Sequence, residues 1–227
     1  MKKHLSITIA SILVIGAPVM VNAQLSFTVT IGGVPSVSGA TLENFNGPSP
    51  SILTLSGIAV IKTGPAFGGL GGGAYVPPYF SGGTAAYFGE SPNTGYDSTK
   101  FVAVADGGLA TLTFPTLERY FGLLVGTVDS GNTLNFYDSA NNLIGTVTGT
   151  QILATGSVLP SDTSPQGTAY INITSTTPFS KVVATYTSES FEFDDVAYAQ
   201  TVPEPASGAL VLAGFVGLGF MSRRKSS

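Results

Sequence analysis

The feature that most limits the fold of this chain is an alternation of apolar and polar residues with period two. In residues 24–31 the apolar positions are Leu25, Phe27, Val29 and Ile31, and polar residues lie between most of them. Successive side chains of a strand point to opposite faces, so this run fits a strand with one buried face. Between residues 24 and 201 no window gives a convincing amphipathic helix, and we therefore expect strands.

The alternation recurs along the chain in runs that are mostly separated by turn residues. The further runs cover residues 51–62, 101–105, 109–114, 120–128, 133–137, 143–147, 169–173, 182–186 and 191–198. Turn sequences such as Asp106-Gly107-Gly108 and Ser130-Gly131-Asn132 lie between them. The 29 Gly and 14 Pro residues also favour turns over long helices. Many short strands joined by such turns predict an all-β fold, an antiparallel β-sandwich of the jelly-roll type.

Residues 63–95 depart from the strand pattern and predict a long loop rich in Gly, Pro and aromatic residues. One interpretation is a glycan-contacting loop in which Tyr75, Tyr79 and Tyr87 stack on sugar rings. The other is that the rings fold back and cover one end of the sandwich, since aromatic side chains bury large areas. The absence of Trp favours the second interpretation.

The N-terminal residues 1–23 are typical of a signal peptide. Lys2 and Lys3 precede an apolar stretch, and Val21-Asn22-Ala23 supplies small residues at a cleavage site. We therefore expect export through the inner membrane and removal of this segment by signal peptidase. The exported β-sandwich is then expected to cover residues 24–201.

The C-terminal residues 202–227 combine three features. Pro203-Glu204-Pro205 resists helix formation, because proline fixes φ and lacks a backbone donor. Residues 206–221 carry no charge and predict a single transmembrane helix of about 24 Å, slightly short for a bilayer core of about 30 Å. The basic cluster 223–225, with Arg223 and Arg224, predicts that the C-terminus stays on the cytoplasmic side.

This order of motif, apolar span and basic cluster resembles the PEP-CTERM sorting signal of exosortase substrates in Gram-negative bacteria. The resemblance implies temporary anchoring in the membrane and recognition of Pro203, Glu204, Pro205, Arg223 and Arg224 by exosortase, a membrane protease or transpeptidase. The tail would then be removed, and the protein would reach the cell surface or the extracellular matrix.

The predicted ectodomain is loosely similar to jelly-roll carbohydrate-binding modules. The similarity rests on residues 41–47 near its start and on residues 191–198 near its end, which contain Asp194-Asp195. It implies a structural Ca²⁺ held by Glu43, Asp194 and Asp195, provided that the first and last strands are neighbours. Because adjacent residues of a strand point to opposite faces, both aspartates can bind one ion only where the strand ends or bulges.

Charge and residue content exclude several kinds of function. Residues 24–202 hold four basic and twelve acidic residues, a formal charge of −8, so no basic patch for nucleic acid exists. The chain has no Cys, and its one histidine is His4 in the predicted signal peptide, so Ser–His–Asp and Cys–His catalysis are excluded from the exported part.

The sequence therefore predicts a protein that is not an enzyme, a structural or binding component associated with exopolysaccharide or biofilm. Two alternatives remain: a carbohydrate-binding module with structural calcium, and a glycoside hydrolase with a carboxylate pair drawn from Glu43, Glu189, Glu192 and Asp194.

Overall fold

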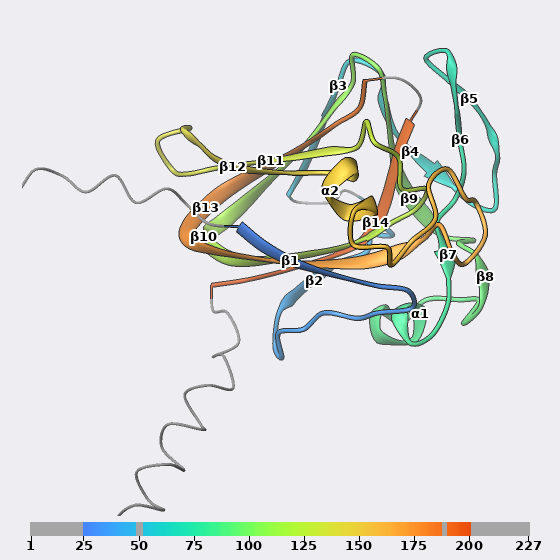
Figure 1. Ribbon diagram of the computed structural model, residues 1–227, viewed down its shortest axis with the longest axis horizontal. Coiled ribbons are helices and arrows are strands. Elements are labelled where there is room, and N and C mark those ends of the chain that lie inside the picture. Colours follow the sequence, from blue (N-terminus) through green and yellow to red (C-terminus); the bar gives the residue numbers. More distant parts are fainter. Residues whose placement is uncertain (1–24, 49–51, 188–189, 201–227) are drawn as a thin grey trace, which may run out of the picture.

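The computed structural model describes residues 25–48, 52–187 and 190–200, which are mostly antiparallel sheet. The predicted all-β sandwich is confirmed for these residues (Figure 1). The predicted signal peptide 1–23, the sorting motif at 203–205, the apolar span 206–221 and the basic cluster 223–225 lie outside them. Within the described ranges, no helix has the length and apolar character needed to cross a bilayer.

Two long strands organise the sandwich. β10 (Leu109–Val125) and β13 (Ala169–Thr185) each have 17 residues and pair along both of their ends. Their register slips between Thr113 and Tyr120, a stretch that contains Pro115. A bulge bends the strands that carry it, so both strands pass from one layer of the sandwich into the other, as Figure 1 shows.

The remaining strands add to the two ends of this long pair. Near Val125 the first layer continues with β1 (Leu25–Thr30), β14 (Ser190–Ala199), β2 (Thr41–Glu43), β9 (Lys100–Ala105) and β4 (Ala59–Thr63). Near Leu109 the second layer continues with β3 (Leu53–Ser56), β11 (Thr133–Tyr137) and β12 (Leu143–Thr148). β14 is thus an interior strand, paired with β10 on one side and with β9 and β2 on the other.

Four phenylalanines hold the two layers together. Phe121 contacts Phe114 and Phe136 edge to face, with ring centroids 6.0 and 5.8 Å apart, and Phe179 contacts the same two rings at 5.7 and 5.2 Å. All four are buried. Edge-to-face pairs add roughly 0.5–1.5 kcal/mol each to the gain from burying the rings.

The hairpin of β11 and β12 shows how its turn is specified. Asp138 Oδ1 accepts hydrogen bonds from the backbone N–H groups of Ala140 and Asn142 at 2.9 and 2.8 Å. Asn141 has φ of 65°, a conformation that Asn tolerates. These side chains therefore form the turn of the hairpin. Directly after β12, the short helix α2 (Gly149–Leu153) begins with a capping box between Thr148 and Gln151.

Residues 64–99, here called the insert, join β4 to β9 and contain the predicted long loop. The insert forms two small hairpins and one short helix: β5 (Gly68–Leu70) with β6 (Gly73–Tyr75), β7 (Tyr79–Phe80) with β8 (Gly95–Tyr96), and α1 (Thr84–Phe88). Phe80 and Phe88 are buried in one cluster with Tyr170 of β13, and Tyr75 is buried against Phe101 of β9. These three rings therefore cover the sandwich, in the way that the second interpretation expected.

Candidate functional site

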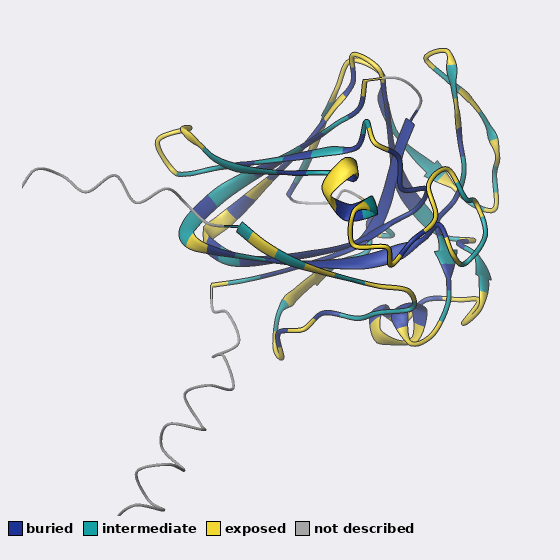
Figure 2. Cartoon of the chain, in the orientation of Figure 1, coloured by how far each residue is buried: buried dark blue, intermediate teal, exposed yellow. Residues whose placement is uncertain are grey.

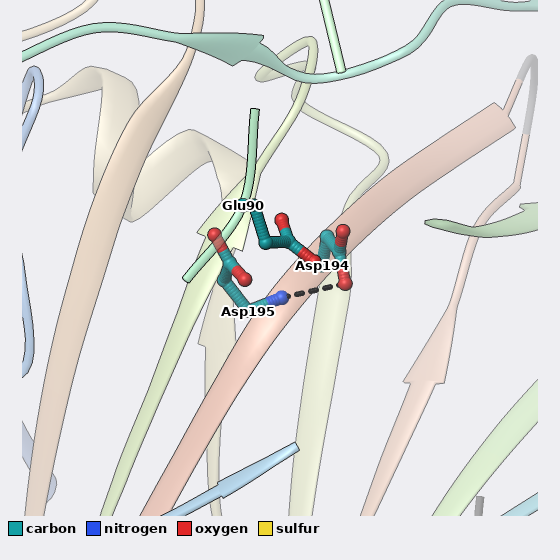
Figure 3. Close-up of side chains that lie close together, drawn as sticks. All are labelled: Glu90, Asp194 and Asp195. Atoms are coloured by element: carbon teal, nitrogen blue, oxygen red, sulfur yellow. Dashed lines mark hydrogen bonds between the residues drawn. The ribbon is translucent and has the colours of Figure 1, made fainter. Parts of the chain in front are cut away.

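Acidic side chains gather on β14, where this strand bulges. Gly122 of β10 lies opposite Ala197, whereas Leu124 lies opposite Asp194, so three steps of β14 face two of β10. Asp195 has φ of +53°, the left-handed region in which Asp is one of the tolerated residues. Its backbone N–H donates to Asp194 Oδ1 at 2.7 Å (Figure 3). The bulge thus meets the condition under which adjacent aspartates can serve one site.

The third carboxylate of this site comes from the insert. Glu90 follows Gly89, the C-cap of α1, and its backbone N–H donates to Ala85 O at 2.8 Å. Ligand oxygens of Glu90, Asp194 and Asp195 all lie within 4.8 Å of one another. Figure 3 shows the three side chains converging from the insert and β14. We call these three residues, with the neighbouring Asp97, the acidic centre.

Polar neighbours position the two acids of the insert. Asn46 Nδ2 donates to Glu90 Oε1, and Thr99 Oγ1 reaches the same oxygen at 3.4 Å. Thr99 also donates its backbone N–H and its hydroxyl to Asp97 Oδ1, at 2.6 and 2.5 Å. One oxygen of each carboxylate is thereby fixed, and the other has no donor.

Burial makes the ionised form of the acidic centre unfavourable when no cation is bound. Asp97, Asp194 and Asp195 are fully buried, and Glu90 is only 8% exposed. Burial, and after it repulsion from Asp97, raises the pKa of Glu90 to about 7. Burial also raises the pKa of Asp194 and Asp195 well above the usual range, and neighbouring carboxylates add to both shifts. In water-excluding surroundings the ionised forms need a compensating charge.

The free oxygens of the acidic centre fit a hard cation. Five buried oxygens have no hydrogen-bond partner: Glu90 Oε2, Asp97 Oδ2, Asp194 Oδ2 and both carboxylate oxygens of Asp195. Ca²⁺ prefers oxygen ligands, and carboxylates bind it in one- or two-oxygen modes. The residues present therefore suit Ca²⁺, which would supply the missing positive charge.

Glu43, the predicted third ligand, is near this site but has another contact. β2 pairs with β14, with Glu43 opposite Val196, so the strand that carries Glu43 is a neighbour of the last strand, whereas the first strand, β1, pairs with β13. Glu43 Oε1 accepts the backbone N–H of Phe45 at 2.9 Å. The Phe45 ring then packs on Phe193 of β14. Glu90, and not Glu43, is the acid that lies within 4.8 Å of both aspartates.

Glu90 and Asp97 were not among the residues singled out from the sequence. Glu90 lies in the segment 63–95, which was interpreted only through its Gly, Pro and aromatic content, and Asp97 lies two residues beyond it. They are the only two acids between Lys62 and Lys100, and this isolation was the one available signal. Their approach to β14 depends on how the insert folds, which local sequence does not reveal.

The three tyrosines predicted as glycan contacts lie in different surroundings. Tyr75 is buried, with the Lys62 ammonium 4.4 Å from its ring centroid. Tyr79 is half-buried and contacts Tyr96 at 5.1 Å between centroids, and Tyr96 contacts Phe67 at 4.9 Å. Phe67 is 52% exposed and Tyr87 is 40% exposed. The insert therefore presents an aromatic row of Phe67, Tyr96 and Tyr79, with Tyr87 as a separate exposed ring.

Another polar site lies at the start of β14. Ser190 and Glu192 line a cavity of about 140 Å³ together with Asp129 and Ser161. The Ser190 hydroxyl donates to Glu192 Oε1, and the Ser161 hydroxyl donates to Asp129 Oδ1 at 2.5 Å. Burial raises the pKa of Glu192 to about 7. Both carboxylates thus have a donor, and neither has a buried oxygen without a hydrogen-bond partner, in contrast to the acids of the acidic centre.

Fold and site together define a jelly-roll β-sandwich with a buried acidic centre. A C-terminal tail, residues 201–227, follows the sandwich. Residues 201–225 match the PEP-CTERM protein-sorting motif, so this chain carries a PEP-CTERM signal, which implies export and delivery to the surface of a Gram-negative cell. The resemblance seen in the tail is confirmed. Among curated proteins, none matches the sequence.

The solved structures that are similar to this chain include carbohydrate-binding modules. A family 6 module studied for its binding sub-sites is 12% identical over 71% of this chain and 94% of its own, with a TM-score of 0.36. A protein from work on glycan recognition by the Ruminococcus flavefaciens cellulosome is 13% identical over 72% and 95%, with a TM-score of 0.33. A family 43 arabinoxylan arabinofuranohydrolase from Bacillus subtilis is 18% identical over 49% of this chain but only 22% of its own, with a TM-score of 0.32.

Proposed function

We propose that this protein is a component of the cell surface or extracellular matrix, which exosortase processes after export. The observation that carries the proposal is the PEP-CTERM motif at 201–225, directly after the last strand of the sandwich. β14 ends at Ala199, four residues before Pro203, so the motif follows the folded domain at once. In this proposal signal peptidase removes residues 1–23 and residues 206–221 hold the protein in the membrane until cleavage.

Mass spectrometry of the protein recovered from the cell surface tests this proposal. We expect the mature chain to lack residues 206–227 in cells with exosortase and to keep them in matched cells without it. An intact C-terminus at Ser227 in both strains contradicts processing. A Glu204→Gln variant, with Glu118→Gln as the matched control, tests whether exosortase recognises the motif itself.

The acidic centre supports a structural Ca²⁺ in the mature protein. Asp194 and Asp195 from β14 and Glu90 from the insert would hold the ion, and Asp97 would add to the negative potential. A ligand that binds only the native state raises its stability in proportion to the logarithm of ligand concentration. We expect the melting temperature to rise with Ca²⁺ and to fall in EGTA, with Mg²⁺ as the control ion. Identical melting in Ca²⁺ and EGTA contradicts the site.

Association with extracellular polysaccharide is the second part of this proposal, and the aromatic row favours it. Phe67, 52% exposed, contacts the half-buried Tyr96 edge to face, and Tyr96 contacts the half-buried Tyr79 in the same way. Tyr87, 40% exposed, is a further accessible ring. Polysaccharide pull-down with Phe67→Ala and Tyr87→Ala tests it. Leu143→Ala on β12 is the control, because Leu143 is also an exposed apolar side chain, at 56%, but lies outside the insert. Absence of binding across neutral and acidic glycans instead favours a purely structural component.

A further inference from the structure

The acidic centre joins two parts of the chain that are about a hundred residues apart. Glu90 and Asp97 belong to the insert, whereas Asp194 and Asp195 belong to β14. The ends of the insert are closed by a hydrogen bond from Gly64 N to Thr99 O at 2.8 Å. A Cβ at Gly64 would lie 1.8 Å from Asp97 O, so this closure leaves no room for a side chain. The insert therefore brings its two acids to β14 as one folded unit.

The acidic centre also lies on an interior strand of the sheet. β14 pairs with β10, β9 and β2, and all of its residues except Ala199 are buried (Figure 2). At the start of the same strand, Ser190 Oγ is also within hydrogen-bond distance of Ala74 O of the insert. A force that separates the insert from β14 thus perturbs both an interior strand of the first layer and the insert that packs on it.

Without a cation, the carboxylates of the acidic centre act as such a force. Ligand oxygens of Glu90 and Asp195 lie within 4.8 Å of each other, and Glu90 Oε2 and both Asp195 oxygens have no hydrogen-bond partner. Two ionised carboxylates at this distance repel each other unless a cation lies between them. In the described part of the chain no Lys or Arg forms an ion pair with these acids. Lys100, which follows Thr99, donates its ammonium to the carbonyl oxygens of Asn46 and Gly47. A buried charge that lacks a partner is strongly destabilising.

We propose that Ca²⁺ is the trigger that completes folding of this ectodomain after export, an inference that rests on the proposed Ca²⁺ site. A site with the affinity common in extracellular modules, roughly 10⁻⁴–10⁻³ M, stays empty at the far lower free Ca²⁺ inside a cell. The chain then reaches the export machinery with the insert and β14 held apart by their carboxylates. Outside, Ca²⁺ binds to both segments and converts their repulsion into a cross-link.

Hydrogen exchange on the full-length chain in detergent micelles tests the trigger. Amide exchange is compared in EGTA, in Ca²⁺ and in Mg²⁺, and Ca²⁺ binding is measured by calorimetry on the same sample. We expect Ca²⁺ alone to slow exchange at least tenfold in peptides from 64–99 and 190–200. If Ca²⁺ binds but exchange is unchanged, the trigger is wrong and the Ca²⁺ site stands. If Ca²⁺ does not bind, both are wrong.

A charge-neutral triple variant, Glu90→Gln with Asp194→Asn and Asp195→Asn, provides the converse test. It removes the repulsion, so its exchange in EGTA is expected to match that of the wild type in Ca²⁺. In cells we expect it to accumulate at least twofold more precursor with residues 1–23 attached, because it folds before export. Glu118→Gln, a buried carboxylate outside the acidic centre, is the control. A triple variant that is protected only in Ca²⁺, or that is exported as fully as the control, overturns the proposal.

Discussion

The substitution Asp195→Asn is expected to have opposite effects in the absence and in the presence of Ca²⁺. Asn has nearly the same size as Asp and also tolerates the left-handed conformation that residue 195 adopts at φ +53°. The backbone hydrogen bond from residue 195 to Asp194 Oδ1 is retained, because it does not involve the substituted side chain. The change therefore removes one buried charge with little change in shape.

The expected magnitudes follow from the surroundings of Asp195. Both of its oxygens are buried without a donor, and an unsatisfied buried polar group costs about 1–3 kcal/mol, or more when charged. In EGTA the variant should therefore be more stable, by about 2–4 °C in melting temperature for each kcal/mol in a domain of this size. In Ca²⁺ at a hundred times the dissociation constant, the wild type gains about 2.7 kcal/mol. The variant, with one charged ligand fewer, should gain much less.

Differential scanning calorimetry in EGTA and across a Ca²⁺ series measures both effects. The two melting curves should cross: the variant melts higher in EGTA and lower in saturating Ca²⁺. Asp106→Asn is the matched control, because Asp106 is exposed in the turn before β10 and should give no crossing. A variant that is less stable than the wild type in EGTA refutes the reasoning, since it would show that the charge of Asp195 is compensated by the protein itself.

Three further predictions concern the fold. Phe136→Ala removes a buried ring that contacts Phe121 and Phe179, and chemical denaturation should show a loss of about 3–5 kcal/mol. Gly122→Ala places a Cβ 2.5 Å from Tyr120 Oη and 2.7 Å from Tyr170 Oη, so near-ultraviolet circular dichroism should report displaced tyrosines and the melting temperature should fall. Asp138→Ala removes the acceptor of the β11–β12 turn, whose hydrogen bonds with Asn142 hold the pKa of Asp138 below its ordinary value of 3.8. Its stabilising effect is present above that value and is lost as the pH falls through the lowered pKa, so the two proteins should differ in melting temperature at pH 7 and converge in acid.

Much of the fold could be predicted from the sequence, because alternation reports which face of a strand is buried. Residues 133–137 and 101–105 were expected as strands and correspond to β11 (Thr133–Tyr137) and β9 (Lys100–Ala105). The errors concern where strands end. Residues 109–114 and 120–128 were expected as two strands but form the single β10, because the polar, Pro-containing stretch between them stays extended and bends.

The opposite error occurs at residues 51–62, which were expected as one run. Gly57 has φ of +61°, and a Cβ there would meet Gly107 O at 2.2 Å. The chain therefore turns at this point and separates β3 from β4. A lone Gly inside a strand pattern indicates a bulge or a close approach of another backbone segment. Here the approach is that of the turn at Gly107, which is distant in sequence, so local sequence could not distinguish the two.

The candidate site was only half predictable for a related reason. Asp194 and Asp195 are adjacent in sequence and lie on a strongly alternating strand, so their proximity was visible. Glu90 comes near them only because α1 ends at Gly89 and the insert folds over β14. Such contacts arise from tertiary packing of a segment without periodicity, and no local pattern encodes them.

The interior position of β14 has a consequence for the order of events during secretion. The last strand of the domain is not an edge strand, because it pairs with β10 on one side and with β9 on the other. In the proposed export, the position between β10 and β9 stays vacant until residues 190–199 have left the translocation channel. The sorting tail directly follows these residues, so we expect assembly of the domain to finish only after the tail has reached the membrane.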